Sequence, residues 1–475
     1  MSSAATDSVH TTLDRGLHQL AALGGDCIDH ANAIGTILWS PPRVVVVGRL
    51  KAGKSTLVNA LIGAPVAETA ALEATNVVTV YRDGSPSRAE VLALDGGRHR
   101  AALRPGAGIE LPIPSAEVAY VDRWLPSAAL RELTLIDTPG LSTLTAANDA
   151  ATRRVMIDGF EQTRTASIDG DAAVFLFDAA PRVDEIEFLH RLPFTPLTML
   201  GVLSRADSFA EGAFGRRDPL THAAAHATAM AGPLAGIVHT IVPVSGLMAQ
   251  TSHTGMLTER HAALLAQLRD VPPLDVLRIF DSEDDPTSGG VPPADRRELL
   301  ALLGEYGVLN GRRIAADGAA ALNTWLAERS GIAALRHALT AATGRFAVLH
   351  RAHRILARLD QLAFTHPARD HIRTLSAGLR ADPALSAVTV LEDYQRMLDV
   401  DPDAAVTDEL RTILTATTPA GRVGLDGHPP PAAVAAEAHR LLAAAQQRTL
   451  ATRSAAEDAA LVTLIRTYTA LAAGH

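Results

Sequence analysis

The residues best suited to chemistry stand in one short segment, GRLKAGKS at positions 48–55. The strand-like run RVVVV precedes it and the helix-like run STLVNAL begins at its last residue, which is the context of a phosphate-binding loop. Glycines let backbone N–H groups surround phosphates, the Lys54 ammonium reaches the outer phosphates, and the Ser55 hydroxyl ligates Mg2+. The residues expected to contact phosphates are Gly48, Arg49, Lys51, Ala52, Gly53, Lys54, Ser55 and Thr56. The segment predicts a nucleotide-binding protein.

A second motif, DTPG at positions 137–140, ends another strand-like run. An aspartate there supports Mg2+ through water, and the Gly140 N–H is placed to contact a γ-phosphate. Between the two motifs, positions 73–79 read EATNVVT, and a threonine in such a loop completes the Mg2+ shell and orients the attacking water. We expect Thr75 to do so, because Thr79 is expected to lie inside a strand. The predicted metal ligands are Ser55, Thr75 and Asp137.

A third motif, LSRAD at positions 203–207, also stands at the end of a strand-like run. The Asp207 carboxylate can accept the ring N–H and the exocyclic amine of guanine, which adenine does not offer in that arrangement. GTPases usually carry Asn or Thr and then Lys where this chain has Ser204 and Arg205. The Arg205 stem and guanidinium can cover the base plane as a lysine would. Downstream, Ser245 and Gly246 fit the strand end whose backbone closes over the base.

Composition limits the architecture. A chain of 475 residues is too long for one compact core and suggests two or three domains. Hydrophobic residues make up 47% and aromatic residues only 4%, and alanine and leucine dominate the ends, so we expect an α/β domain joined to an all-α part. Cys27 is the single cysteine, which excludes an internal disulfide framework and a cysteine-rich zinc site and fits a reduced cytosol.

Charge and hydropathy limit the partners. The formal net charge of −9 argues against a general nucleic-acid role. No apolar run approaches the roughly 18 residues that a membrane span requires, and the N-terminus lacks a basic region followed by an apolar one. We therefore expect a cytoplasmic protein.

The periodicity of the chain predicts its organisation. Helical spacing at positions 8–38 ends at two prolines, and strand-like runs then alternate with helices or loops, which predicts a mostly parallel sheet with helices on both faces. The strand-like runs are 43–47, 77–81, 90–94, 133–136, 172–177, 198–203 and 237–244. Beyond position 345, helical stripes of apolar residues predict a bundle. We expect N-terminal helices at 1–40, an α/β P-loop GTPase domain at 41–345, and a helical bundle (neck or trunk) at 346–475, which the N-terminal helices complete.

With these motifs in this order, the chain resembles the dynamin superfamily. It is most similar to the compact bacterial dynamin-like proteins typified by the isoniazid-inducible pair of mycobacteria, especially the shorter member. The segments that carry the resemblance are GRLKAGKSTLVNAL at 48–61, EATNVVT at 73–79, DTPG at 137–140, SRAD at 204–207, PVSG at 243–246 and ERSGIAALR at 328–336. The resemblance implies a GTPase domain on a helical neck or trunk, binding of GTP and GDP with Mg2+, nucleotide-driven dimerisation across the GTP face, and membrane remodelling.

Two departures from the family pattern bear on turnover. Leu141 stands where Ras-like GTPases have a water-orienting glutamine, so Thr75, a backbone group or a second subunit must position the water. Eukaryotic dynamins place Gln-Ser ahead of Ala-Gly-Lys, where this chain has Leu50 and Lys51. Lys51 either supplies positive charge to the reaction or faces solvent. We expect slow intrinsic turnover, with Lys54, Thr75 and Lys51 as the catalytic candidates.

The membrane expectation is open between alternatives. The region expected to form the trunk tip, within positions 365–430, is rich in Asp, Arg, Pro and Thr, whereas membrane-inserting relatives carry an exposed hydrophobic hairpin there. Arg351, Arg354 and Arg358 flank an apolar stripe, where they either meet lipid phosphates or form an ordinary solvated flank.

Three hypotheses follow for function. The first is a dynamin-like GTPase that hydrolyses GTP with Mg2+ and couples the cycle to self-association, at the inner face of the cell membrane and in peripheral contact with anionic lipid. The second is a slow or inactive GTP-binding regulatory partner of a larger dynamin-like protein. The third is an ATPase from another branch of the P-loop proteins.

Overall fold

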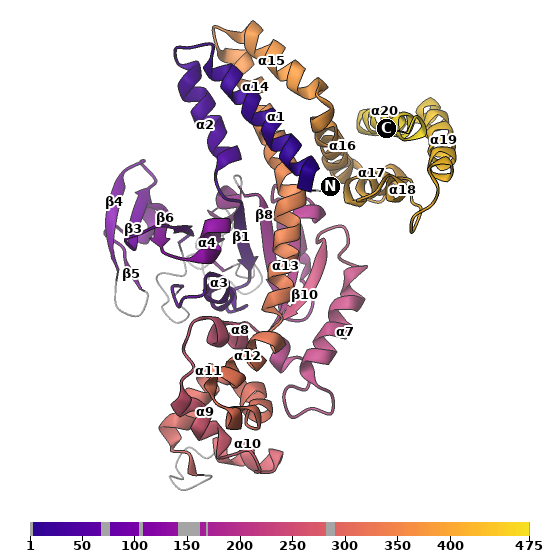
Figure 1. Cartoon of the computed structure of the whole chain (residues 1–475). Helices are drawn as coiled ribbons and strands as arrows, with labels where there is room; N and C mark the ends of the chain where they lie inside the picture. Colours follow the sequence, from indigo (N-terminus) through magenta and orange to yellow (C-terminus); the bar gives the residue numbers. More distant parts are fainter. Residues whose placement is uncertain are drawn as a thin grey trace. The chain divides into compact units, whose positions relative to one another are not determined.

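The computed structural model describes residues 3–67, 77–103, 108–140, 162–167, 170–281 and 290–474 (Figure 1). The chain divides into two compact units. Residues 41–341 form one, which we call the α/β unit. Residues 1–40 and 342–475 form the other, which we call the helical unit.

Ten of the described strands form one sheet in the α/β unit, in the order β10-β9-β8-β1-β7-β2-β6-β3-β4-β5. Their bounds are β1 Arg43–Gly48, β2 Thr79–Asp83, β3 Arg88–Ala93, β4 Arg98–Leu103, β5 Ile109–Glu110, β6 Val118–Leu125, β7 Thr134–Asp137, β8 Ala172–Phe177, β9 Met199–Ser204 and β10 Thr240–Val244. Neighbouring strands from β10 to β7 are parallel. The mostly parallel sheet that the sequence predicts is confirmed.

The central strands are apolar because both of their faces are covered. Every residue of β8 and β9 is buried, as is all of β1 except its first residue. Continuous apolar runs of this kind are typical of parallel strands between two layers of helices. One core cluster joins β1 and β8 to α6 (Val183–Leu189) and α7 (Pro219–Ala231). The helix α3 (Lys54–Ile62) packs against β1 and β7.

An antiparallel extension contains β3, which the strand-like run 90–94 predicts, and adds β4, β5 and β6, which the sequence analysis did not predict. Strand β6 runs parallel to β2 and antiparallel to β3, and β4 and β5 follow β3 at the edge. Only one residue of β4 is buried, and β3 alternates between buried and half-buried positions. Because β4 is mostly exposed, it lacks the apolar run that identifies a buried strand, whereas the sequence VAYVDRWL of β6 could have been recognised.

Further α-helices complete the α/β unit. Their bounds are α4 Ala128–Glu132, α8 Gly246–His253, α9 Glu259–Ala266, α10 Pro273–Asp281, α11 Pro293–Gly311, α12 Ala319–Arg329 and α13 Ile332–Ala342, whose last residue falls in the helical unit. Helices α8 to α12 enclose a core of their own that includes Met248, Leu265, Leu303 and Leu322. Helix α11 is kinked at Gly304, which has a φ of 65°.

Long amphipathic helices build the helical unit, as the apolar stripes predict. The bounds are α1 Ser3–Ala21, α2 Cys27–Trp39, α14 Val348–Thr365, α15 Arg369–Ala381, α16 Ser386–Val400, α17 Ala405–Thr415, α18 Pro419–Arg422, α19 Pro431–Arg448 and α20 Ala455–Ala472. The pair α1 and α2 packs against α14 and α15 (Figure 1), so the N-terminal helices join helices from beyond position 347. Helix α20 packs against α16, α17 and α19.

Arg351 follows neither of the alternatives considered for the three arginines of α14. Arg351 is only 9% exposed, and its Nη1 donates hydrogen bonds to the carbonyl oxygens of Leu38 and Ser40, the latter at 2.8 Å. The guanidinium thus satisfies acceptors at the C-terminal end of α2, where helical carbonyls lack intrahelical donors. Arg354 is half-buried, and Arg358 is exposed.

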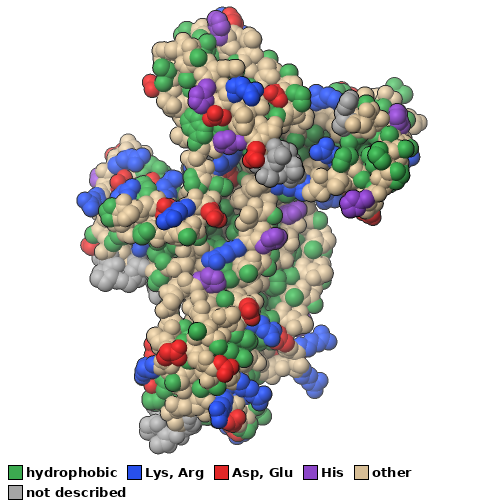
Figure 2. Space-filling view, in the orientation of Figure 1, with side chains coloured by type: hydrophobic (Ala, Val, Ile, Leu, Met, Phe, Trp, Pro, Cys, Tyr) green, Lys and Arg blue, Asp and Glu red, His purple; other side chains and the backbone are tan. Residues whose placement is uncertain are grey.

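Basic and acidic side chains lie interspersed on the face shown in Figure 2, over the part of the chain that the structure describes. This distribution agrees with the small negative net charge and offers no extended basic face there for nucleic acid. Among the described helices, none combines the length and the apolar character that crossing a membrane requires.

Candidate functional site

The phosphate-binding loop lies between β1 and α3 in the conformation that its sequence requires. Gly53 has a φ of 95° as the N-cap of α3, and Lys51 adopts a φ of 65°, which is uncommon for a residue with a side chain. Lys54 is 8% exposed, and its Nζ donates hydrogen bonds to the carbonyl oxygens of Gly48 at 3.0 Å and Arg49 at 2.9 Å. Burial lowers the pKa of Lys54. The ammonium is thus held inside the loop.

Asp137, the last residue of β7, lies beside Ser55. The Ser55 hydroxyl donates to Asp137 Oδ2 at 3.4 Å, while the buried Oδ1 has no hydrogen-bond partner among the described residues. Burial raises the pKa of Asp137 to about 6, although Lys54 and the Ser55 hydroxyl act in the opposite direction. A buried carboxylate oxygen without a donor, next to a serine hydroxyl, fits a hard divalent cation. Mg2+ would be held here by Ser55 with the support of Asp137.

The DTPG turn packs closely against the phosphate-binding loop. The Thr138 hydroxyl donates to the Val46 carbonyl at 2.7 Å, which ties the turn to β1. A Cβ on Gly140 would lie 2.7 Å from the Cα of Leu50, so only glycine allows this approach. Thr75 and Leu141 lie outside the described residues. Thr79 is in β2, paired with Asp137 of β7, and lines the cavity.

The SRAD motif is connected to the phosphate-binding loop by its arginine. Arg205 adopts a left-handed conformation with a φ of 54°, and its Nη2 donates to the Lys51 carbonyl at 2.8 Å. Ser204 is buried and donates to the Phe177 carbonyl at 3.1 Å. Asp207 lines the cavity beside Gly304, where an added Cβ would lie 3.4 Å from Asp207 Oδ2. The kink in α11 therefore lies directly beside this carboxylate.

Ser245 and Gly246 differ in what they contact. Ser245 is the N-cap of α8; its hydroxyl accepts from the Met248 N–H at 3.3 Å, and its own N–H donates to the Ser330 carbonyl at 2.9 Å. Gly246 lines the cavity beside Thr56. Of the two, Gly246 therefore lines the cavity, whereas Ser245 caps α8.

The motifs surround one cavity of about 720 Å3, within the range of ordinary ligand pockets. The predicted site residues that line it are Lys51, Ala52, Gly53, Lys54, Ser55, Thr56, Asp137, Gly140, Ser204, Arg205, Asp207 and Gly246. Among the described residues, Gly48, Arg49 and Ser245 stand behind this lining instead. Tertiary folding has brought together segments that are distant in sequence.

Arg49 has a specific place behind the loop. Its Nε lies 3.2 Å from Oε1 of Glu185, whose side chain is 4% exposed. Glu185 also accepts from the Arg182 backbone N–H at 2.8 Å through Oε2, at the start of α6. Burial raises the pKa of Glu185. The arginine thus connects the phosphate-binding loop to α6.

Two residues that support the site were missed by the sequence analysis. Arg123 in β6 is buried and lines the cavity, and its Nη1 donates to the Val66 carbonyl at 2.5 Å. Asn59 in α3 accepts from the backbone N–H groups of Val66 and Ala67 at 2.8 and 2.6 Å. The apolar run VAYV at the start of β6 and the asparagine inside the apolar helix run at 57–62 were both visible signals.

Comparison with known proteins places this geometry in a family. The sequence model of the family described as 50S ribosome-binding GTPase matches residues 43–199. The chain is 32% identical over 442 residues to the isoniazid-induced protein IniC of Mycobacterium tuberculosis, an alignment that covers 87% of each protein. The chain belongs to the IniC family of bacterial dynamin-like proteins. Its α/β unit is therefore a GTPase domain that binds guanine nucleotide.

Two further proteins resemble this member of the IniC family to a more limited extent. The isoniazid-induced protein IniA of Mycobacterium tuberculosis is 40% identical over 111 residues, which is 22% of this chain and 17% of IniA. A solved structure described as an oligomerised bacterial dynamin pair, with a mechanism for long-range sensing and tethering of membranes, is 14% identical with a TM-score of 0.34. That alignment covers 83% of this chain and 78% of the solved one.

Proposed function

We propose that this IniC-family GTPase hydrolyses GTP with Mg2+, with slow intrinsic turnover, and couples the cycle to self-association and to peripheral contact with the inner face of the cell membrane. The observation that carries the hydrolytic part is the buried Oδ1 of Asp137, which lacks a donor among the described residues beside the Ser55 hydroxyl. A bound Mg2+ would supply charge neutralisation to the β- and γ-phosphates.

The roles proposed for the chain's own groups follow from their positions around the cavity. Lys54 binds the outer phosphates, and the backbone of residues 48–56 surrounds the phosphate chain. Gly140 contacts the γ-phosphate through its N–H, and Asp207 accepts the two donors of guanine. The Arg205 stem covers the base while its guanidinium holds the Lys51 carbonyl. Thr75, with Ser55, is proposed to complete the metal shell and to orient the water.

Slow turnover is proposed because the position of the water-orienting glutamine is occupied by Leu141. A second subunit that faces the cavity would then supply the missing group, which links hydrolysis to self-association. The rival proposal is a slow or inactive regulatory partner of a larger dynamin-like protein.

Nucleotide binding by the full chain tests the site. Lys54→Ala should abolish GTP binding, because the variant loses the ammonium group that is held inside the loop and is proposed to bind the outer phosphates. Asp207→Asn should shift preference from guanine toward xanthine nucleotide, since an amide pairs with the xanthine carbonyl. Full GTP affinity in Lys54→Ala would contradict the role proposed for Lys54, and an unchanged base preference in Asp207→Asn would show that Asp207 does not select guanine.

Co-sedimentation with anionic liposomes tests the membrane part. We expect pelleting with a non-hydrolysable GTP analogue and less pelleting with GDP, together with faster GTP hydrolysis as protein concentration rises. Turnover that does not change with protein concentration or liposomes would instead favour the regulatory partner.

A further inference from the structure

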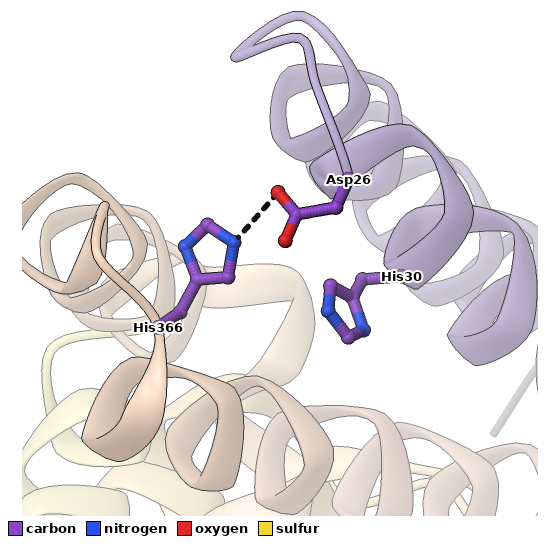
Figure 3. A group of neighbouring side chains, drawn as sticks. All are labelled: Asp26, His30 and His366. Atoms are coloured by element: carbon purple, nitrogen blue, oxygen red, sulfur yellow. Dashed lines mark hydrogen bonds and ion pairs between the residues drawn. The ribbon is translucent and has the colours of Figure 1, made fainter.

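Three side chains with metal-ligating atoms converge in the helical unit (Figure 3). They are Asp26, His30 and His366, and one ligand atom from each lies within 4.8 Å of the other two. The Asp26 Oδ1 is 3.0 Å from the His366 Nε2. We propose that these three residues bind one Zn2+ ion and thereby connect the corner between α1 and α2 to the corner between α14 and α15.

The helix ends explain why these side chains meet. Asp26 is the N-cap of α2 and His30 lies four residues later, so both side chains project from the same face of its first turn. His366 is the C-cap of α14, and its backbone N–H still donates to the Leu362 carbonyl. The imidazole is therefore carried by a rigid helix end rather than by a free loop.

The geometry is close to that of a zinc site. Ligands at about 2.1 Å from a tetrahedral ion are separated from each other by about 3.4 Å. The 3.0 Å spacing between Asp26 and His366 and the upper limit of 4.8 Å for the set bracket this value. Small side-chain rotations therefore suffice to admit the ion, and water would complete its coordination.

The ligand types favour Zn2+ over the Mg2+ of the nucleotide site. Two imidazoles and one carboxylate are typical zinc ligands, whereas Mg2+ prefers an oxygen-only shell. Cys27 contributes a neighbouring soft atom, since its Sγ lies 3.8 Å from the His366 Nε2. Asp26 is exposed and His30 half-buried, which opens the site to solvent, while the His366 side chain is only 8% exposed.

Binding requires one local proton shift. In the metal-free structure the Ala368 N–H donates to His366 Nδ1 at 3.0 Å, so the neutral ring carries its proton on Nε2 and donates it to Asp26. When Nε2 binds the ion, that proton moves to Nδ1 and the Ala368 N–H turns to water. The change costs one part-buried hydrogen bond of the backbone, which is small beside the free energy of a zinc–ligand set.

Zinc titration of the full chain in excess Mg2+ tests the proposal, with bound Zn2+ measured by equilibrium dialysis. The wild type should bind one tight equivalent. His30→Ala, His366→Ala and Asp26→Asn should each weaken it by at least about tenfold, because even removing a residue behind a ligand costs that much. Zn2+ should also raise the thermal midpoint of the wild type and not that of His30→Ala.

The chain supplies a matched control. Asp14 and His18 on α1 share the spacing of Asp26 and His30, and the His18 Nδ1 lies 3.4 Å from the Asp14 Oδ2. Among the described residues, no third metal-ligating side chain joins this pair. His18→Ala should therefore leave Zn2+ binding unchanged. His30 and Asp26 are accessible, so their variants should fold even if His366→Ala does not. The cluster would be only an ion pair if the wild type bound no Zn2+. The same would follow if His30→Ala and Asp26→Asn bound Zn2+ as tightly as the wild type.

Discussion

At the scale of single residues, two residues beside the expected phosphate position are in energetically unfavourable states. Asp137 has a buried oxygen without a donor among the described residues, and Lys51 holds a left-handed conformation. Such features usually persist where a ligand or a mechanism uses them. Each leads to a measurable prediction.

The raised pKa of Asp137 predicts a pH dependence of Mg2+ affinity in the nucleotide complex. With a pKa of about 6 in the folded protein, the carboxyl group is ionised above that pH and protonated below it. Since cation binding requires the ionised form, Mg2+ affinity should fall by about tenfold per pH unit below 6. Titrations of wild type and Asp137→Asn between pH 5 and pH 7.5 check this. The same pH dependence in both proteins would exclude Asp137, because only the nucleotide titrates in the variant.

Lys51→Gly separates the charge of this residue from its backbone conformation. Glycine tolerates the φ of 65° and keeps the carbonyl that Arg205 holds, so only the ammonium is lost. We expect kcat for GTP to fall by at least about tenfold, as for other lost transition-state charges, with GDP affinity nearly unchanged. Lys51→Arg is the charge-conserving control. Unchanged turnover of Lys51→Gly in single-turnover assays would assign Lys51 to solvent.

At the scale of elements, helix α13 is positioned by one contact from within the helix and one just before its first residue. Arg336 donates to the Ala60 carbonyl at 2.9 Å, near the end of α3, and the Ser245 N–H donates to the Ser330 carbonyl just before α13. Gly331 makes the turn between α12 and α13 with a φ of 80°. Packing of this turn against β10 therefore fixes α8 and α3, which line the cavity.

Gly331→Ala should disrupt that packing. A Cβ there would lie 2.2 Å from the Pro243 carbonyl oxygen, and alanine disfavours the positive φ. We expect the free energy of unfolding to fall by roughly 2 to 4 kcal/mol, measured by urea denaturation, with weaker GTP binding. Gly236→Ala is the control, since no atom lies within 4 Å of its added Cβ. A loss no larger than in the control would contradict the role of this turn.

At the scale of the whole molecule, two compact units predict two separable unfolding events. GDP with Mg2+ at about 100 times its Kd should stabilise the α/β unit by about 2.7 kcal/mol. The residues proposed to bind the nucleotide all belong to that unit, so hydrogen exchange should slow in β1, β7 and α3 and remain unchanged in α19 and α20. Equal protection of both units by GDP would instead reveal that they unfold together.

The sequence by itself determined the α/β architecture with its helical second part and the residues of the phosphate-binding loop. Both depend on local information: apolar periodicity identifies buried strands and helices, and the atoms proposed to bind phosphates are contiguous in GRLKAGKS. The DTPG and SRAD motifs could be placed for the same reason, because each follows an apolar strand.

Only the tertiary structure decided which groups stand behind the site and which meet across the chain. Nothing in the local sequence of β6 shows that its Arg123 lines the cavity and donates to the Val66 carbonyl, and the pairing of Arg49 with Glu185 joins segments without a shared motif. Asp26 and His366 are 340 positions apart, and only the packing of two helix corners brings them together. Such contacts depend on long-range packing, which local sequence patterns do not encode.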